Sequence, residues 1–351
     1  MNTKIIGAGS SIPNLIIKNE DFLQQEFFDE KGRLIPNPES IVSKFKEITG
    51  IEERRYAEQT YVTSDLAFEA AQKAIADAQI DQESLDYIIL AHNYGDVPYG
   101  SIQSDTVPSL AARVKAKLGI VNPKCVAYDV LFGCPGWIEG LIQAYAFIRA
   151  GMAKRCLVIG ADVLSRVTDQ HDRDTMIFAD GAGAVVVEAQ ADQPGILATA
   201  SATYAVQELD YLNFGPSYKQ ELTRDVCYIK MKGRKIYEFA LSRVPEAMKA
   251  CLDQGNIPID QVKKVLIHQA NEKMDYAILE RFYKLYDMAP PEDVMPMTIH
   301  KLGNSSVATI PTLYDLMKRD LLPGQQLKAG DIVLFASVGA GMNINAVAYQ
   351  V

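Results

Sequence analysis

Cys134 is the residue whose setting most favours chemistry. It lies in YDVLFGCPGW (128–137), where an apolar segment leads through Gly133 to Cys134 and Pro135. Glycine permits a tight turn, and proline suits the first position of a helix because no backbone donor is lost there. We therefore predict a strand, a turn, and Cys134 at the N-cap of the next helix. The helix dipole there favours a thiolate and lowers the thiol pKa, and a thiolate attacks thioester carbonyls.

The remaining cysteines lack this context. We expect them to be buried, inert thiols, as most cysteines are: Cys125, Cys156, Cys227 and Cys251.

His268 and Asn304 are the candidate partners of Cys134. His268 ends the apolar segment of VLIHQAN, at the carboxyl edge where α/β sheets keep their sites, although a strand-end histidine can also be structural. Asn304 lies in KLGNSSVAT, between a predicted strand and a predicted helix, a position that equally suits a simple N-cap. We expect the other three histidines to lie at the surface or rim: His92, His171 and His300.

A cysteine with a histidine and an asparagine supports two kinds of chemistry. In a hydrolase-like triad the histidine deprotonates the sulfur. In a Claisen condensation the histidine and the asparagine donate hydrogen bonds to a second thioester carbonyl and stabilise its enolate. Spacing does not separate the two. The turn Gly339-Ala340-Gly341 lets backbone N–H groups approach a substrate oxygen, but it is also compatible with a plain strand connection.

A diverged internal repeat indicates how these residues are positioned. An amphipathic helix at Ser64–Gln79 precedes the apolar strand Ile88–Leu90, and a helix at Leu241–Asn256 precedes Val265–Ile267. Both strands are short and rich in β-branched residues, as buried strands are. The repeat predicts a duplicated α/β fold.

The repeat continues through both halves. We predict paired strands at 124–130 and 294–299, paired helices near 136–149 and 306–319, and paired strands at 156–162 and 331–339. Glycine turns at 181–183 and 339–341 are expected to precede the last strand of each half. The boundary near 189–195 divides the chain into 1–190, with the nucleophile, and 191–351, with the histidine and asparagine. We expect the two halves to pack as one body.

Composition excludes several classes of protein. The 351 residues are sufficient for a large core, and the formal net charge of −9 disfavours nucleic acid and anionic membranes as partners. Apolar runs fall short of the roughly 18 residues of a membrane span, and we see no secretory signal. The five scattered cysteines show no metal-type spacing, so we expect a cytoplasmic protein with free thiols and no metal.

Together these motifs resemble the β-ketoacyl-[acyl-carrier-protein] synthase III family of the thiolase superfamily. The resemblance extends over nearly the whole chain, through KIIGAGSSIPN (4–14), TGIEERR (49–55), YDVLFGCPGW (128–137), FADGAGA (178–184), HQAN (268–271) and GNSSVAT (303–309). It implies a thiolase-like, five-layered αβαβα fold, internally duplicated, and a homodimer. It also implies decarboxylative Claisen condensation of an acyl thioester with malonyl-acyl carrier protein, in fatty acid or specialised polyketide-type biosynthesis. No cofactor is implied beyond the phosphopantetheine of acyl carrier protein or coenzyme A that carries the substrates.

The resemblance also implies roles for individual residues. Cys134 is the acylated cysteine, and His268 and Asn304 support decarboxylation. The family's oxyanion hole falls on the backbone N–H groups of Cys134 and Ala340. The acyl pocket is expected at Val107, Phe178 and Val338, and carrier docking at Lys273, Arg234 and Lys235, extended by Lys232.

Several positions depart from the family pattern. Lys44 and Ile48 stand where a tryptophan and an arginine often enclose the adenine of coenzyme A, so we expect acyl carrier protein or another donor to supply the first acyl group. Val107 replaces a bulky aromatic that caps the partner's pocket, which predicts room for a longer or bulkier acyl chain. Val338 and Ile344 replace aromatics beside the last glycine turn. The segments 28–40, expected to be a surface loop, and 96–105 are longer than in the simplest family members. Together with the substitutions, they suggest a specialised branch of the family.

Four alternatives stay open at this point. They are acyl transfer to an oxygen or nitrogen acceptor, condensation in resorcinol- or quinolone-type secondary metabolism, a thioester hydrolase, and a non-catalytic subunit of a heteromeric synthase.

Overall fold

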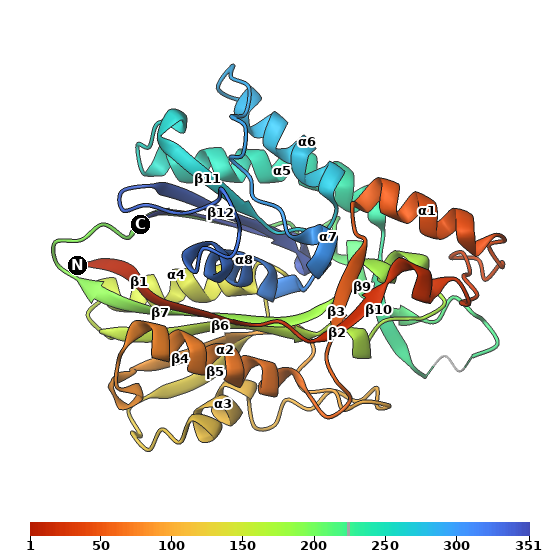
Figure 1. The fold of residues 1–351 in the computed structure, drawn as a ribbon, viewed down its shortest axis with the longest axis horizontal. Coiled ribbons are helices and arrows are strands. Elements are labelled where there is room, and N and C mark those ends of the chain that lie inside the picture. Colours follow the sequence, from red (N-terminus) through yellow and green to blue (C-terminus); the bar gives the residue numbers. More distant parts are fainter. Residues whose placement is uncertain (223–224) are drawn as a thin grey trace.

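Five layers of secondary structure form the molecule (Figure 1). The computed structural model describes residues 1–222 and 225–351. Two mixed β-sheets enclose a central layer of helices, and each sheet carries further helices on its outer face. The predicted thiolase-like αβαβα arrangement is therefore confirmed.

The first sheet has the strand order β1-β7-β6-β4-β5. Its members are β1 (Asn2–Ser11), β4 (Tyr87–Ala91), β5 (Val126–Val130), β6 (Arg155–Val163) and β7 (Asp180–Gln190). The strands β5, β4 and β6 run parallel, whereas β7 is antiparallel to both β6 and β1. Because β5 lies at the edge, it leaves one side of its backbone unpaired within this sheet.

The second sheet has the order β11-β12-β13-β8. Its members are β8 (Ile196–Thr203), β11 (Val262–Ile267), β12 (Ile332–Gly339) and β13 (Asn343–Gln350). The predicted strand at 294–299 is wrong: the segment runs beside β11, where the Val265 N–H donates to the Val294 carbonyl at 2.8 Å, but no strand forms. Pro296 lacks the backbone donor that a ladder needs.

The central layer contains α4 (Gly136–Arg149) and α8 (Thr309–Lys318). Trp137 of α4 packs edge to face on Phe335 of β12, with ring centroids 5.7 Å apart. Both rings belong to a core that draws residues from both sheets, so the two halves pack as one body.

The outer helices cover the two sheets (Figure 1). Those over the first sheet are α2 (Thr63–Ala78) and α3 (Leu110–Leu118), and those over the second are α5 (Gly233–Gln254) and α6 (Glu272–Lys284). At one end lie the remaining helices and two antiparallel ribbons: α1 (Pro38–Thr49), α7 (Ile299–Leu302), β2 (Leu15–Lys18) with β3 (Glu53–Tyr56), and β9 (Leu212–Pro216) with β10 (Cys227–Met231).

The predicted glycine turn at 181–183 is wrong, because these residues lie inside β7. A Cβ atom at Gly183 would lie 2.7 Å from the backbone nitrogen of Thr312 on α8. Glycine is therefore required by the close approach of the helix to the sheet.

The strands of the first sheet all precede residue 191 and those of the second all follow it. On this ground we propose that the chain divides into the halves 1–190 and 191–351.

Candidate active site

Cys134 lies in the connection between the end of β5 and the start of α4. Gly133 has a φ of +67°, a conformation that favours glycine, and turns the chain sharply after the strand. The helix begins at Gly136 with Pro135 as its N-cap. The prediction of Cys134 as the N-cap is therefore wrong by one residue, because Cys134 directly precedes the N-cap.

The thiol of Cys134 is protonated in the unliganded protein. The pKa of this thiol is raised to about 11, mainly by burial and to a smaller extent by the nearby Asp162 carboxylate. A hydrogen bond from Ser306 and the backbone N–H of Cys134 itself act in the opposite direction. The prediction of a lowered thiol pKa is therefore wrong for this state, since desolvation outweighs the start of the helix.

Two glycine turns bring the backbones around Cys134 and Ala340 together. A Cβ atom at Gly133 would lie 2.6 Å from the Ala340 nitrogen, and a Cβ atom at Gly339 would lie 2.4 Å from the Cys134 nitrogen. Any side chain at either position would force the two segments apart. The two N–H groups expected to form the oxyanion hole thus belong to segments in close backbone contact, and Cys134 and Ala340 line the same cavity.

Asn304 is buried and fixed at several points. It follows α7 and Gly303, rather than the strand we predicted. Its N–H donates to the Ile177 carbonyl at 2.9 Å, and its carbonyl accepts from the Ala179 N–H at 2.8 Å. Its side-chain Oδ1 accepts from the Ser306 N–H at 2.8 Å. Because Oδ1 is engaged, the amide Nδ2 remains the group that can donate to a ligand.

His268 directly follows β11, and its backbone N–H donates to the Ala336 carbonyl at 2.9 Å. Its side chain is buried, and burial lowers the imidazole pKa to about 4, opposed in part by a hydrogen bond with the Ser306 backbone. Nδ1 has no hydrogen-bond partner within the described part of the chain. His268 is therefore a neutral imidazole at physiological pH.

Ser306 contacts all three predicted catalytic residues. Its hydroxyl donates to Cys134 Sγ at 3.4 Å, its N–H donates to Asn304 Oδ1, and its backbone bonds to His268. The structure thus brings Cys134, His268 and Asn304 to one place. Sequence reasoning assigned no role to Ser306, and its position two residues after Asn304 was the only signal for it.

A cavity of about 200 Å³ lies over Cys134. Of the predicted acyl-pocket residues only Phe178 lines it, whereas Val338 is buried in the core between the second sheet and its outer helices, and Val107 is 85% exposed. The structure therefore does not bring Val107 and Val338 to this cavity within one protomer. The sequence missed most of its walls: Asn93, Tyr94, Leu164, Leu212, Asn213, Phe214 and Ile229.

Comparisons with known protein families give two matches to this chain. The sequence model for 3-oxoacyl-[acyl-carrier-protein] synthase III matches residues 128–205, and the model for the C-terminal part of that family matches 252–351. A β-ketoacyl-[acyl-carrier-protein] synthase III from Erythrobacter litoralis is 33% identical over 347 residues, which cover 97% of each chain.

The chain belongs to the β-ketoacyl-[acyl-carrier-protein] synthase III family. Its members are condensing enzymes of the acyltransferase type, as predicted. The family enzyme from Staphylococcus aureus strain Newman is 32% identical, covering 99% of this chain and 98% of its own. The crystal structure of the Aquifex aeolicus enzyme superposes with a TM-score of 0.80 at 31% identity, over 99% of this chain and all of the other.

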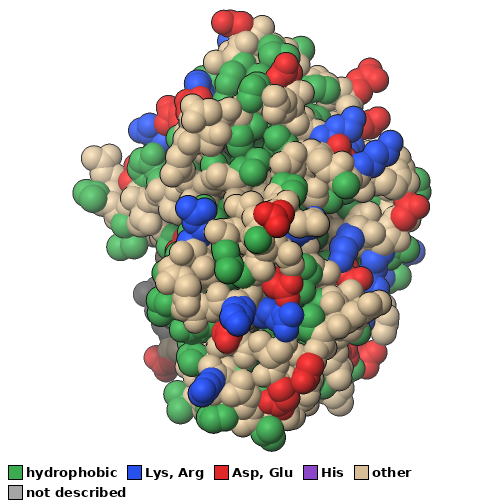
Figure 2. Space-filling view, turned by 90° about the vertical axis from the view of Figure 1, so that its left-hand side faces the viewer, with side chains coloured by type: hydrophobic (Ala, Val, Ile, Leu, Met, Phe, Trp, Pro, Cys, Tyr) green, Lys and Arg blue, Asp and Glu red, His purple; other side chains and the backbone are tan. Residues whose placement is uncertain are grey.

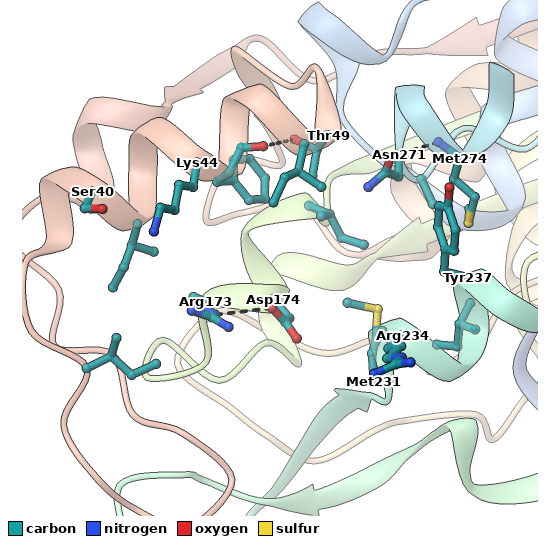
Figure 3. Close-up of a pocket in the computed structure, with 18 of the residues that line it drawn as sticks. Ser40, Lys44, Thr49, Arg173, Asp174, Met231, Arg234, Tyr237, Asn271 and Met274 are labelled. Atoms are coloured by element: carbon teal, nitrogen blue, oxygen red, sulfur yellow. Dashed lines mark hydrogen bonds and ion pairs between the residues drawn. The ribbon is translucent and has the colours of Figure 1, made fainter. Parts of the chain in front are cut away.

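A second, larger cavity of about 640 Å³ opens beside this site in the new family member. Lys44 and Ile48 of α1 line it, as do Arg173 on the segment before β7, Arg234 at the start of α5, and Asn271 at the start of α6 (Figure 3). Ile177 lines this cavity and its neighbour Phe178 lines the smaller one. The two cavities therefore lie on two sides of one short segment.

The segment 28–40, predicted to be a surface loop, packs some of its side chains against the rest of the protein. Phe28 packs edge to face on His171, with centroids 5.7 Å apart, and Ile35 lines the larger cavity. The surface placement of His171 is wrong, because its ring is buried and its Nδ1 lies 2.9 Å from the Glu26 carbonyl.

Two other sequence expectations about single residues are also wrong. His92 is buried, with Nε2 3.1 Å from Asp129. Cys227 is exposed on β10, whereas Cys125, Cys156 and Cys251 are buried as expected. All five cysteines are free.

The predicted docking residues lie near the larger cavity and are exposed. The Arg234 side chain is 90% exposed and pairs with Glu238, and the Lys273 ammonium lies 3.8 Å from Glu47. Lys235 is exposed beside Arg234, as is Lys232. At the opposite end of the molecule, acidic and basic side chains are interspersed (Figure 2).

Within residues 1–222 and 225–351, no group of three or more histidine, cysteine or acidic side chains could hold a metal ion. In the same part of the chain, no helix is long and apolar enough to cross a membrane.

Proposed function

We propose that this enzyme condenses an acyl group held on Cys134 with a malonyl group on acyl carrier protein. The observation that supports this is the meeting of Cys134, His268 and Asn304 around Ser306. Cys134 and Ser306 line a mostly apolar cavity. Fatty acid or specialised polyketide-type biosynthesis is the setting that such a product fits.

The reaction has two steps. In the first, Cys134 Sγ bonds to the acyl carbon of a thioester donor, the carbon–sulfur bond to the carrier breaks, and the carrier thiol leaves with the proton that Cys134 gives up. In the second, the malonyl thioester loses carbon dioxide, and the electron pair of the broken bond forms an enolate. The enolate carbon attacks the acyl carbon, Cys134 leaves as the sulfur anion, and a β-ketoacyl thioester is released.

Each step generates negative charge on an oxygen. The backbone N–H groups of Cys134 and Ala340 suit the oxyanion on the acyl carbon, because preorganised donors stabilise charge as it develops. The Nδ2 of Asn304 suits the enolate oxygen of the second substrate, since it donates without bringing a net charge. Neutral His268 carries a single N–H, which becomes the second donor when it turns from the Ser306 backbone to the substrate.

The substrates fit the two cavities in different ways. The larger cavity has basic groups at Lys44, Arg173 and Arg234 that suit the phosphate of a carrier-bound phosphopantetheine, with Lys235 and Lys273 available to the carrier protein. The smaller cavity, at about 200 Å³, falls below the roughly 300 Å³ at which drug-sized ligand sites begin. Within one protomer it therefore suits a short acyl group.

A homodimer is part of the proposal. Val107 and Leu131 are exposed near β5, the edge strand of the first sheet. A second copy seated there would cover these apolar side chains, and Val107 of the partner could then close the acyl pocket with a small side chain. We place the dimer in the cytoplasm, where its free cysteines stay reduced.

Intact-protein and peptide mass spectrometry after incubation with acyl-acyl carrier protein or acyl-coenzyme A tests the first step. The acyl adduct should appear on Cys134 and be absent from Cys134→Ala. Cys227→Ala is the matched control, since Cys227 is the exposed thiol that non-specific acylation would reach. An undiminished adduct in Cys134→Ala would refute the nucleophile.

Release of labelled carbon dioxide from malonyl-acyl carrier protein tests the second step. Asn304→Ala should keep the acyl adduct and lose carbon dioxide release and the β-keto product. Free acid as the sole product of the wild-type protein would instead establish a hydrolase, and acyl transfer without carbon dioxide release would establish a simple acyltransferase.

A further inference from the structure

A chain of hydrogen bonds behind the candidate nucleophile has no part in the reaction described so far. Ser306 Oγ lies 3.4 Å from Cys134 Sγ, and Asn93 Nδ2 lies 2.9 Å from Ser306 Oγ. Asn93 in turn contacts both oxygens of Asp162, through its backbone N–H at 2.8 Å and through Nδ2 at 2.6 Å. Asp162 and Ser306 are buried, so water does not substitute freely for these contacts.

The chemistry of the four groups fixes the direction of this chain. The amide nitrogen of Asn93 carries two hydrogens and accepts none. It therefore donates one to Asp162 and one to Ser306. The reverse amide orientation would place the Asn93 oxygen against the Asp162 carboxylate, which is unfavourable.

Ser306 Oγ thus accepts from Asn93, and its own hydrogen remains to be donated. A hydrogen bond from Ser306 lowers the pKa of the Asp162 carboxyl group, so Asp162, whose oxygens also accept from Asn93, shares the Ser306 hydrogen with Cys134 Sγ. The Ser306 hydroxyl also has the geometry to donate to Cys134 Sγ, at 3.4 Å, and this hydrogen bond gains strength when the sulfur is an anion. A hydroxyl that donates to sulfur stabilises the thiolate more than the thiol.

The backbone of Ser306 is held equally firmly. Its φ is +54°, an uncommon conformation for a residue other than glycine. The contacts of its N–H to Asn304 Oδ1 and of its backbone to His268 hold it there. Such a conformation persists where the surroundings over-determine it, and it is enriched at functional sites.

We propose that Ser306 is a positioning residue, whose hydroxyl, oriented by Asn93 and Asp162, holds the sulfur of Cys134 for attack and stabilises it as a thiolate. The catalytic purpose of this role rests on the proposed function, but the role itself can be measured without a substrate. Through its N–H the same residue turns the donor nitrogen of Asn304 toward the substrate.

The rate at which iodoacetamide alkylates Cys134, followed by peptide mass spectrometry between pH 6 and 9.5, measures thiolate formation without any substrate. Removing the hydroxyl in Ser306→Ala and in Ser306→Gly should slow alkylation at pH 8 by about 10- to 100-fold, the range for a hydrogen bond to a charged group. Ser305→Ala is the matched control, because the Ser305 hydroxyl lies 3.4 Å from Thr309 Oγ1 and away from the sulfur. It should alkylate at the wild-type rate.

The glycine variant separates the hydroxyl from the backbone. Alanine keeps the Cβ of serine and hence its backbone restriction at a φ of +54°, whereas glycine removes that restriction, so equal slowing in both variants assigns the effect to the hydroxyl. Wild-type rates in Ser306→Gly, whether or not Ser306→Ala folds, would overturn the proposal. In acylation assays, the rate of adduct formation should fall while the donor concentration at half-maximal rate is unchanged; a rise in that concentration alone would also overturn it.

Failure of the proposed function would look different. A wild-type protein that forms no acyl adduct on Cys134 would refute the condensation, and the alkylation rates would still decide the role of Ser306.

Discussion

The uncharged state of His268 is open to a direct titration. Burial lowers the pKa of this imidazole to about 4, and Nδ1 has no partner in the described residues that would favour a second proton. At pH 7 an imidazole with an ordinary pKa of about 6.5 is roughly one quarter charged, whereas at a pKa of about 4 roughly one molecule in a thousand is charged. We therefore expect His268 to stay neutral across the physiological range.

The same burial makes stability depend on pH with a definite sign. The folded protein binds fewer protons at His268 than the unfolded chain, so the contribution of a neutral His268 is complete above about pH 6.5. It is lost as the pH falls toward 4, at about 1.4 kcal/mol per pH unit and about 3 kcal/mol in total. His268→Gln removes this titration, so the difference in unfolding free energy between the two proteins should change by about 2 kcal/mol between pH 6.5 and pH 5.

Two measurements check this expectation. Heteronuclear NMR of labelled histidine should show one imidazole, identified by its loss in His268→Gln, with no titration above about pH 5. Urea unfolding of both proteins at pH 7.5, 6.5 and 5 gives the linkage. A His268 resonance that titrates near pH 6.5, with a stability difference independent of pH, would refute the argument from burial.

Three further predictions follow from single contacts. In Gly339→Ala the new Cβ would meet the Cys134 nitrogen at 2.4 Å, so the rate of acylation should fall about 100-fold; a rate within threefold of wild type would contradict the proposed oxyanion hole. Both carboxylate oxygens of Asp275 lack partners in the described residues, and burial raises its pKa well above the ordinary value. The folded state therefore holds the proton more tightly than the unfolded chain, and stability falls as pH rises above about 4. Asp275→Asn should then stabilise the protein more at pH 8 than at pH 5 in urea unfolding, and equal effects at the two pH values would refute this. Phe214→Ala should enlarge the small cavity and shift the preference between competing donors toward longer acyl chains by about tenfold, whereas an unchanged ratio would exclude Phe214 from the acyl pocket.

The sequence alone predicted the positions of residues whose local structure is determined by adjacent residues. Gly133 and Pro135 mark a turn and a helix start on either side of Cys134, and β11 ends where the apolar run before His268 ends. Such local signals also predicted the layers of helices and sheets, because helices and buried strands differ in length and in the spacing of their hydrophobic residues. They misplaced the strand at 294–299, where Pro296 forbids the ladder that the repeat suggested.

Properties that depend on distant segments were out of reach of the sequence. The walls of the small cavity come from β9 and from the stretch after β4, and Tyr94 and Phe214 meet there with ring centroids 4.8 Å apart. Neither residue lies in a motif. The Ser306 contact with Cys134 spans 172 positions, and the thiol pKa depends on burial that only the folded chain creates.

The pKa values of the Cys134 thiol and the His268 imidazole together help to distinguish condensation from hydrolysis. With the thiol pKa raised to about 11 and the imidazole pKa lowered to about 4, moving the proton from Cys134 to His268 is strongly unfavourable in the unliganded site. A hydrolase-like triad depends on that transfer, whereas a condensing enzyme does not. In the proposed condensation the proton leaves with the thiol of the donor, and the hydrogen bonds of Ser306 and of the Cys134 backbone N–H stabilise the sulfur anion. Burial therefore acts on both residues: it disfavours base activation of Cys134 and keeps His268 neutral. A neutral imidazole is the form that the proposed role in enolate formation requires.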